Sequence, residues 1–112
     1  MKIAISSTGK DLKSEVAGVF GRCQYFLIVE IDGGKIQGFE AVENTSSKQT
    51  GGAGVSAAQI VAEKNVNAVV TGNIGPRALD VFRQFNIEVY NGSGQANEVV
   101  QKFMEGKLEK FK

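Results

Sequence analysis

The chain has no histidine, and it has a single cysteine, Cys23. Histidine is the commonest general base and the commonest zinc ligand in proteins, so its absence excludes the most familiar catalytic and zinc-binding arrangements. One cysteine cannot form an internal disulfide, which is typical of proteins from a reducing compartment. We therefore expect a cytoplasmic protein.

The chain lacks a large excess of either charge, because 13 basic and 12 acidic side chains leave a net charge of only +1. Such a chain has no overall field that would draw it to nucleic acid or to an acidic membrane, and we expect neither as a partner. The sequence also lacks an apolar run of membrane-spanning length and a signal-peptide pattern. With 42% hydrophobic residues, we expect one soluble domain over residues 1–112, with a charged tail from about residue 106.

The distribution of apolar residues predicts an α/β fold. Short runs of β-branched and aromatic residues indicate strands, and apolar residues that return every three or four positions indicate helices. Strands are predicted at Lys2–Ser6, Tyr25–Ile31, Lys35–Glu43, Ala68–Thr71 and Ile87–Tyr90, and helices over 55–64, after Pro76 and around Val99–Met104. Helical crossovers imply that the first, fourth and fifth strands are parallel, while the second and third form an antiparallel hairpin. The expected architecture is a five-stranded mixed sheet with three helices.

Two segments carry more specific signals. Gly38 interrupts the apolar residues of the strand over 35–43, which suggests a bulged strand at the edge of the sheet. Residues 44–54 are mainly Ser, Thr, Gly, Asn and Gln, which bury little surface, so we expect a mobile surface loop there.

Ligands of open parallel sheets bind beyond the carboxyl ends of the strands, where three small polar segments should meet: 6–9, 71–76 and 91–94. Glycine lets a ligand approach the backbone, and free N–H groups at helix starts carry positive partial charge, so this rim suits an anion. The segment 51–54 opens a helix and can close over the same crevice. The candidate binding residues are Ser7, Thr8, Gly9, Arg22, Gly51, Gly52, Ala53, Gly54, Gly72, Asn73, Gly75, Asn91 and Gly92. The alternative is that the glycines only form turns.

The usual catalytic patterns are missing. Residues 51–54 lack the Lys-Ser/Thr ending of a phosphate-binding loop, and no G-x-G-x-x-G motif follows the first strand. That strand ends in Ser6 and Ser7 without a carboxylate, whereas two-metal phosphoryl chemistry needs clustered acidic side chains. No nucleophile and base can be paired from the sequence, so we predict no catalytic residues and a binding domain instead of an enzyme.

Cys23 is the only soft metal ligand near the motif Phe20-Gly21-Arg22. The guanidinium of Arg22 would favour the thiolate, which can ligate a metal. The alternative for Cys23 is a small, buried apolar residue. Arg22 can instead hold an anion directly or pair with a surface carboxylate, and Arg77, in the first turn of its helix, is a second candidate anion contact.

Five motifs, in order and over nearly the whole chain, resemble the dinitrogenase iron-molybdenum cofactor biosynthesis domain. They are Met1-Lys2-Ile3-Ala4-Ile5, Phe20-Gly21-Arg22 followed by Tyr25-Phe26, Gly51-Gly52-Ala53-Gly54, Gly72-Asn73-Ile74-Gly75-Pro76-Arg77-Ala78 and Ile87-Glu88-Val89-Tyr90. The resemblance implies a ribonuclease H-like fold with a five-stranded mixed sheet. It also implies a non-catalytic binder or carrier of an iron-molybdenum or iron-sulfur cluster, or of a molybdenum-containing anion, that works with cofactor-assembly proteins.

Many members of this family have histidine immediately before Phe-Gly-Arg as a candidate cluster ligand, but this chain has Val19 there. We hypothesise that Cys23, three residues after Phe20, replaces that ligand. Two other interpretations stay open. One is a protein-interaction module without a small-molecule ligand, in which a partner strand adds to the strand from Lys35. The other is a small enzyme with a site built from backbone groups.

Overall fold

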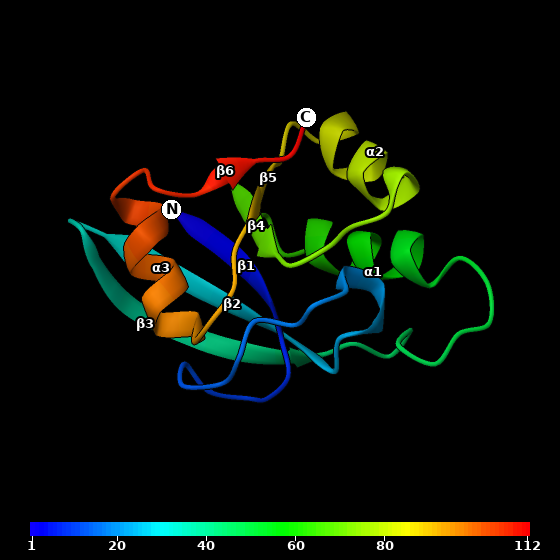
Figure 1. Ribbon diagram of the computed structural model, residues 1–112, viewed down its shortest axis with the longest axis horizontal. Helices are drawn as coiled ribbons and strands as arrows, with labels where there is room; N and C mark the ends of the chain where they lie inside the picture. The colour runs from blue at the N-terminus through cyan, green and yellow to red at the C-terminus, as the bar shows by residue number, and fades with distance from the viewer.

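A six-stranded sheet lies between helices in the structure, a computed structural model that describes all residues, 1–112 (Figure 1). The strands are β1 (Lys2–Ser7), β2 (Tyr25–Asp32), β3 (Lys35–Glu43), β4 (Ala68–Thr71), β5 (Glu88–Asn91) and β6 (Glu109–Lys110). The helices are α1 (Ala53–Ala62), α2 (Pro76–Gln84) and α3 (Ala96–Met104), with a short 3₁₀ helix, η1 (Phe20–Arg22). The strand order is β3-β2-β1-β4-β5-β6, in which β1, β4 and β5 are parallel. The predicted α/β class, mixed sheet and three helices are confirmed.

Successive side chains of a strand point to opposite faces of the sheet, so the apolar residues form two cores, one on each face. In β1, Ala4 faces the core under α1 and α2, whereas Ile3 and Ile5 face the core under α3. Figure 1 shows α3 apart from α1 and α2, across the sheet. The candidate site lies on the α1 and α2 side.

β2 and β3 form the predicted hairpin. Gly33 and Gly34 take positive φ angles of 59° and 74°, which suit a tight two-residue turn. The pairing register shifts between Glu30 and Ile31, next to Gly38, so β3 carries the predicted bulge. β3 is one edge of the sheet.

The predicted number of five strands is wrong, because the tail adds β6. Glu109 and Lys110 pair antiparallel with Asn91 and Tyr90 of β5. The side chain of Phe111 then packs against the core under α1 and α2. Two charged residues show no apolar alternation, so the sequence pattern does not indicate this strand.

The helix boundaries differ from the prediction by a few residues. α1 begins at Ala53, two residues before the expected start, because Gly52 takes a left-handed φ of 69° and is its N-cap. α3 begins at Ala96 behind a capping box formed by Gln95 and Glu98. No helix has the length and apolar character that crossing a membrane requires.

Candidate functional site

The carboxyl ends of the parallel strands are covered by the chain itself. Residues 12–19 cross them and bond to all three strand-end loops. The Ala17 N–H donates to the Ser6 carbonyl at 2.9 Å, and the Ala17 carbonyl accepts from the Gly72 N–H at 3.1 Å. The Asn73 N–H donates to the Gly18 carbonyl at 2.7 Å. Contrary to the prediction, this edge holds protein backbone and not an open crevice.

Two glycines at the strand ends serve close packing. A Cβ at Gly72 would lie 2.7 Å from the Gly18 carbonyl oxygen, and one at Gly92 would lie 2.6 Å from Cγ1 of Val70. The side chain of Asn91 is also engaged within the chain, since its Nδ2 donates to the Gly72 carbonyl at 2.6 Å. Eight of the predicted binding residues therefore lie outside the cavity described next: Ser7, Thr8, Gly9, Gly51, Gly72, Asn73, Asn91 and Gly92.

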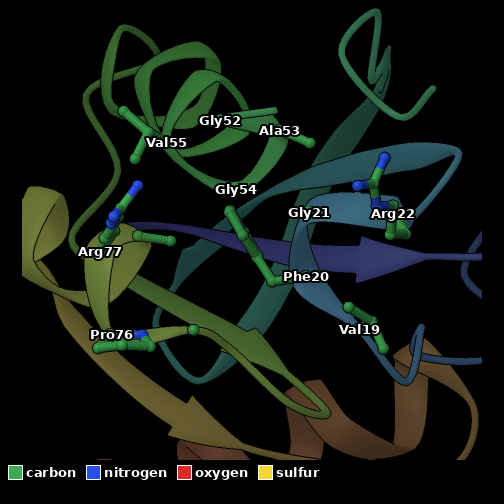
Figure 2. A pocket seen from close by; sticks show the side chains of 12 residues that line it. Val19, Phe20, Gly21, Arg22, Gly52, Ala53, Gly54, Val55, Pro76 and Arg77 are labelled. Atoms are coloured by element: carbon green, nitrogen blue, oxygen red, sulfur yellow. The ribbon is translucent and has the colours of Figure 1, made fainter. Parts of the chain in front are cut away.

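A cavity of about 340 Å³ lies between η1 and the starts of α1 and α2 (Figure 2). Three short segments line it: residues 19–22, 52–55 and 75–78. The second and third segments are equivalent, since each comprises the N-cap and the first three residues of a helix. The structure thus brings five predicted residues together around one space: Arg22, Gly52, Ala53, Gly54 and Gly75.

The cavity wall contains free backbone donors, because the first N–H groups of an α-helix have no partner inside the helix. In α1 the N–H groups of Ala53, Gly54 and Val55 donate to no group of the chain. The same holds in α2 for the N–H groups of Arg77 and Ala78. Neither helix has a side-chain cap or an acidic residue in its first turn. Free amides and the positive ends of two helix dipoles therefore border a space that suits an anion.

The charged side chains at the cavity belong to Arg22 and Arg77. Arg77 is exposed and forms no ion pair, and Figure 2 shows its guanidinium extending toward the start of α1. Arg22 is engaged elsewhere, because its Nη1 donates to the carbonyls of Ser47 and Gln49 at 3.0 and 2.7 Å. Both arginines bring positive charge to the cavity, and Arg77 is the one whose guanidinium has no hydrogen-bond partner in the chain.

Gly21 lets η1 lie directly against the start of α1. A Cβ at this position would lie 2.9 Å from the Gly54 Cα and 3.0 Å from the Gly54 nitrogen. Phe20 anchors the same turn in the core, where its ring centre lies 5.2 Å from that of Phe26 and 5.3 Å from that of Phe82. The Phe-Gly pair thus fixes one wall of the cavity.

The loop before α1 is anchored at its beginning, although a mobile surface loop was expected over its whole length. The Nδ2 of Asn44 donates to the carbonyls of Gly21 and Cys23 at 3.3 and 2.9 Å. The Ser46 hydroxyl donates to Oδ1 of Asn44 at 2.7 Å, and both side chains are buried. The continuous exposed stretch of the loop is residues 48–52.

Cys23 is buried, with 4% of its surface exposed. Burial raises the pKa of its thiol to about 12, and hydrogen bonds to the Ser7 backbone and the Asn44 side chain offset only part of that effect. The expectation that Arg22 favours the thiolate is wrong, because the guanidinium bonds to loop carbonyls. No group of three or more Cys, Asp or Glu residues is arranged to hold a metal ion.

Val19 stands on the wall between this cavity and a neighbouring one of about 270 Å³. It is 53% exposed, although it is apolar, and a backbone bridge to Asn73 holds it in place. Thr8 and Cys23 line the neighbouring cavity. The position at which the family resemblance places a histidine therefore does border the candidate site.

Sequence reasoning missed half of the cavity wall. The N-caps Gly52 and Gly75 were predicted because they are glycines at helix starts, whereas most apolar residues of the same turns were not predicted. The residues it missed as site residues are Val19, Phe20, Gly21, Val55, Pro76 and Ala78. The usable signal was the start of each helix, since an N-cap and its first turn point their amides the same way.

The chain is similar to known proteins over nearly its whole length. A family model described as dinitrogenase iron-molybdenum cofactor matches residues 1–106. An uncharacterized protein of Methanocaldococcus jannaschii is 42% identical, in a match that covers 99% of this chain and 92% of the relative.

Solved structures agree with the fold over its full length. The apo form of the orange protein from Desulfovibrio gigas has a TM-score of 0.91 at 28% identity, covering 98% of this chain and 92% of that protein. A Thermotoga protein with the provisional name NifB protein has a TM-score of 0.80 at 33% identity, in a match that covers 97% of this chain and 91% of that protein.

Proposed function

The chain belongs to the dinitrogenase iron-molybdenum cofactor family, and on that premise we propose that it is a non-catalytic carrier in cofactor assembly. Its cargo is an anionic iron-molybdenum or iron-sulfur cluster, or a molybdenum-containing anion, bound in the cavity between η1 and the starts of α1 and α2. It acts in the cytoplasm with other cofactor-assembly proteins. The order of the first five strands supports the ribonuclease H-like fold that the family resemblance implies.

The observation that carries this proposal is the meeting of two uncapped helix starts at one cavity. Each start contributes partial positive charge and free amide donors, and Arg77 adds a full charge. An anion accepts these hydrogen bonds without displacing any existing partner. A cation would be repelled by the same groups.

A cluster held here would rest on hydrogen bonds and charge instead of covalent ligands. The cavity wall has no Cys, His, Asp or Glu, and the buried thiol of Cys23 stays protonated at neutral pH. Amide and guanidinium groups donate well to the sulfide or oxo groups on the outside of a cluster anion. Val19 lies on the cavity wall, and many family members have histidine, a candidate cluster ligand, at that position. This supports the cavity as the binding site.

The composition of the wall also supports a carrier over an enzyme. Apart from Arg22 and Arg77, the lining side chains are those of Gly, Ala, Val, Phe and Pro. Arginine stays protonated in proteins and does not serve as a base, and none of the others is a nucleophile.

Anaerobic reconstitution with iron, sulfide and molybdate tests the proposal by metal analysis and absorption spectroscopy. We expect the wild-type protein to retain metal through gel filtration. Arg77→Gln should bind about fivefold more weakly, since an exposed charged contact contributes roughly 1 kcal/mol.

Arg83→Gln is the matched control, because Arg83 lies on the same helix, pairs with Asp80 at 3.7 Å and is absent from the cavity wall. Cys23→Ala should bind metal as the wild-type protein does. A wild-type protein that stayed colourless and metal-free while it captured a protein partner would contradict the carrier and favour an interaction module.

A further inference from the structure

Arg22 connects η1 to the loop before α1. One nitrogen, Nη1, donates to two backbone carbonyls, those of Ser47 at 3.0 Å and Gln49 at 2.7 Å. Figure 2 shows the guanidinium of Arg22 extending from η1, across the cavity from Arg77. Its hydrogen bonds therefore act on the loop and not on the cavity contents.

No other hydrogen bond ties residues 47–51 to the body of the protein. The remaining ones stay within the loop: the N–H groups of Ser47 and Gln49 donate to the carbonyls of Asn44 and Ser46, and the Gln49 side chain donates to Gly51. Most of this stretch is also exposed. Arg22 is thus the one hydrogen-bonded anchor of the exposed half of the loop.

The anchored stretch leads directly into the cavity wall. It ends at Gly52, which holds a left-handed backbone as the N-cap of α1. The free amides of Gly54 and Val55 follow at once. The direction of these amides thus depends on how the chain enters the helix, which is the part that Arg22 holds.

We propose that Arg22 is a positioning residue for the anion cavity. By holding the loop at Ser47 and Gln49, it fixes the start of α1 so that the amides over 53–55 point at a bound anion. This inference rests on the proposed function, and it assigns one task to the whole Phe20-Gly21-Arg22 motif. Phe20 anchors the turn, Gly21 permits contact with α1, and Arg22 holds the approach to α1.

Hydrogen exchange of Arg22→Lys and Arg22→Gln tests the anchor in the whole protein. Lysine keeps the charge, but its side chain is one bond shorter than the path to Nη1, the nitrogen that meets both carbonyls. We expect faster exchange over 47–55 in both variants and unchanged exchange in the sheet. Unchanged exchange over 47–55 in Arg22→Gln would overturn the proposal.

Binding of molybdate, alone and after reconstitution with iron and sulfide, tests the consequence. Both variants should bind about tenfold more weakly, because the loop must then be ordered when the anion binds. In Arg22→Lys, which keeps the charge beside the cavity, the salt dependence of binding should match that of the wild-type protein, whereas in Arg77→Gln, which removes a charge, it should become shallower. Wild-type affinity in Arg22→Lys together with weak binding in Arg22→Gln would instead make Arg22 a direct charge contact and overturn the proposal.

Failure of the proposed function is a distinct result. If the wild-type protein binds neither molybdate nor the reconstituted metal, the carrier is contradicted, and a positioning role toward an anion falls with it. If the wild-type protein binds metal and the Arg22 variants bind it equally well, the carrier stands and the role of Arg22 is overturned.

Discussion

The thiol of Cys23 is buried in the core under α1 and α2, where Nδ2 of Asn44 donates to its Sγ at 3.8 Å. Burial raises its pKa to about 12, so the thiol is protonated throughout the physiological range. The thiolate is the form that ligates metals and reacts with oxidants. The contribution of Cys23 in this state is therefore to packing.

The buried thiol predicts a specific loss of stability in base. An unfolded chain ionises its thiol near the ordinary pKa of 9.0, whereas the folded protein keeps the proton up to about pH 12. Between these values the unfolded state binds fewer protons, so rising pH favours unfolding. Urea denaturation at about pH 8 and about pH 10.5 should show a larger loss of unfolding free energy in the wild-type protein than in Cys23→Ala. Equal losses in the two proteins would contradict the burial of the thiol.

Residue identity alone predicts such roles poorly. The sequence places Arg22 beside Cys23, which suggested a stabilised thiolate. The group that reaches Cys23 is Asn44, 21 positions away, and the groups that hold Arg22 lie 25 and 27 positions away. Those contacts depend on how the loop before α1 folds back on η1, and no local pattern carries that information.

At the scale of elements, η1, α1 and α2 meet closely enough to form a cavity because small residues lie where they touch. Gly21 faces Gly54, and Gly54 in turn faces Ala78 of α2, where an added Cβ would lie 3.5 Å from the Ala78 Cβ. α1 and α2 therefore pack with their starts side by side. Larger side chains at these positions would separate the amides that border the cavity.

Gly21→Ala is expected to destabilise the protein by about 1–3 kcal/mol, the usual cost of overpacking. The added Cβ would meet backbone atoms of Gly54, which cannot move aside as a flexible side chain can. Gly18→Ala is the matched control, because an added Cβ there has no neighbour within 4 Å. Thermal unfolding measures both, and equal melting temperatures would contradict the close contact between η1 and α1.

The tail strand gives a second prediction at this scale. Phe111 packs on the core under α1 and α2, so Phe111→Ala should lower the unfolding free energy by about 1–2 kcal/mol for a partly buried aromatic side chain. Phe85, which is 60% exposed, provides the control, and Phe85→Ala should change the unfolding free energy by less than about 0.5 kcal/mol. A tail that contributes nothing would leave the two variants equally stable.

Most elements could be predicted because their signals are local. The apolar runs of β1 and β2 and the double glycine between β2 and β3 each determine one element within a few positions. The cover over the strand ends could not be predicted, since residues 12–19 are held by backbone bonds to loops far along the chain. That cover is why the site lies at the helix starts and not at the strand ends.

At the scale of the whole molecule, the three helices differ in how their N-termini are capped. α3, on the other face of the sheet, has a capping box and Glu98 in its first turn. Glu98 satisfies one amide and places negative charge there, which disfavours an anion. α1 and α2 have neither feature, and these are the two helices whose starts meet. The fold thus concentrates its free amides at one place.

The most direct test of an anion site at this place is a nuclear magnetic resonance titration of the wild-type protein with molybdate, following backbone amides. We predict that the largest chemical-shift changes fall on the amides over 53–55 and 77–78. The amide resonances at the start of α3 should not shift. Shifts confined to the strand-end loops over 7–9, 72–73 and 91–92, or no shift at any concentration, would contradict the account.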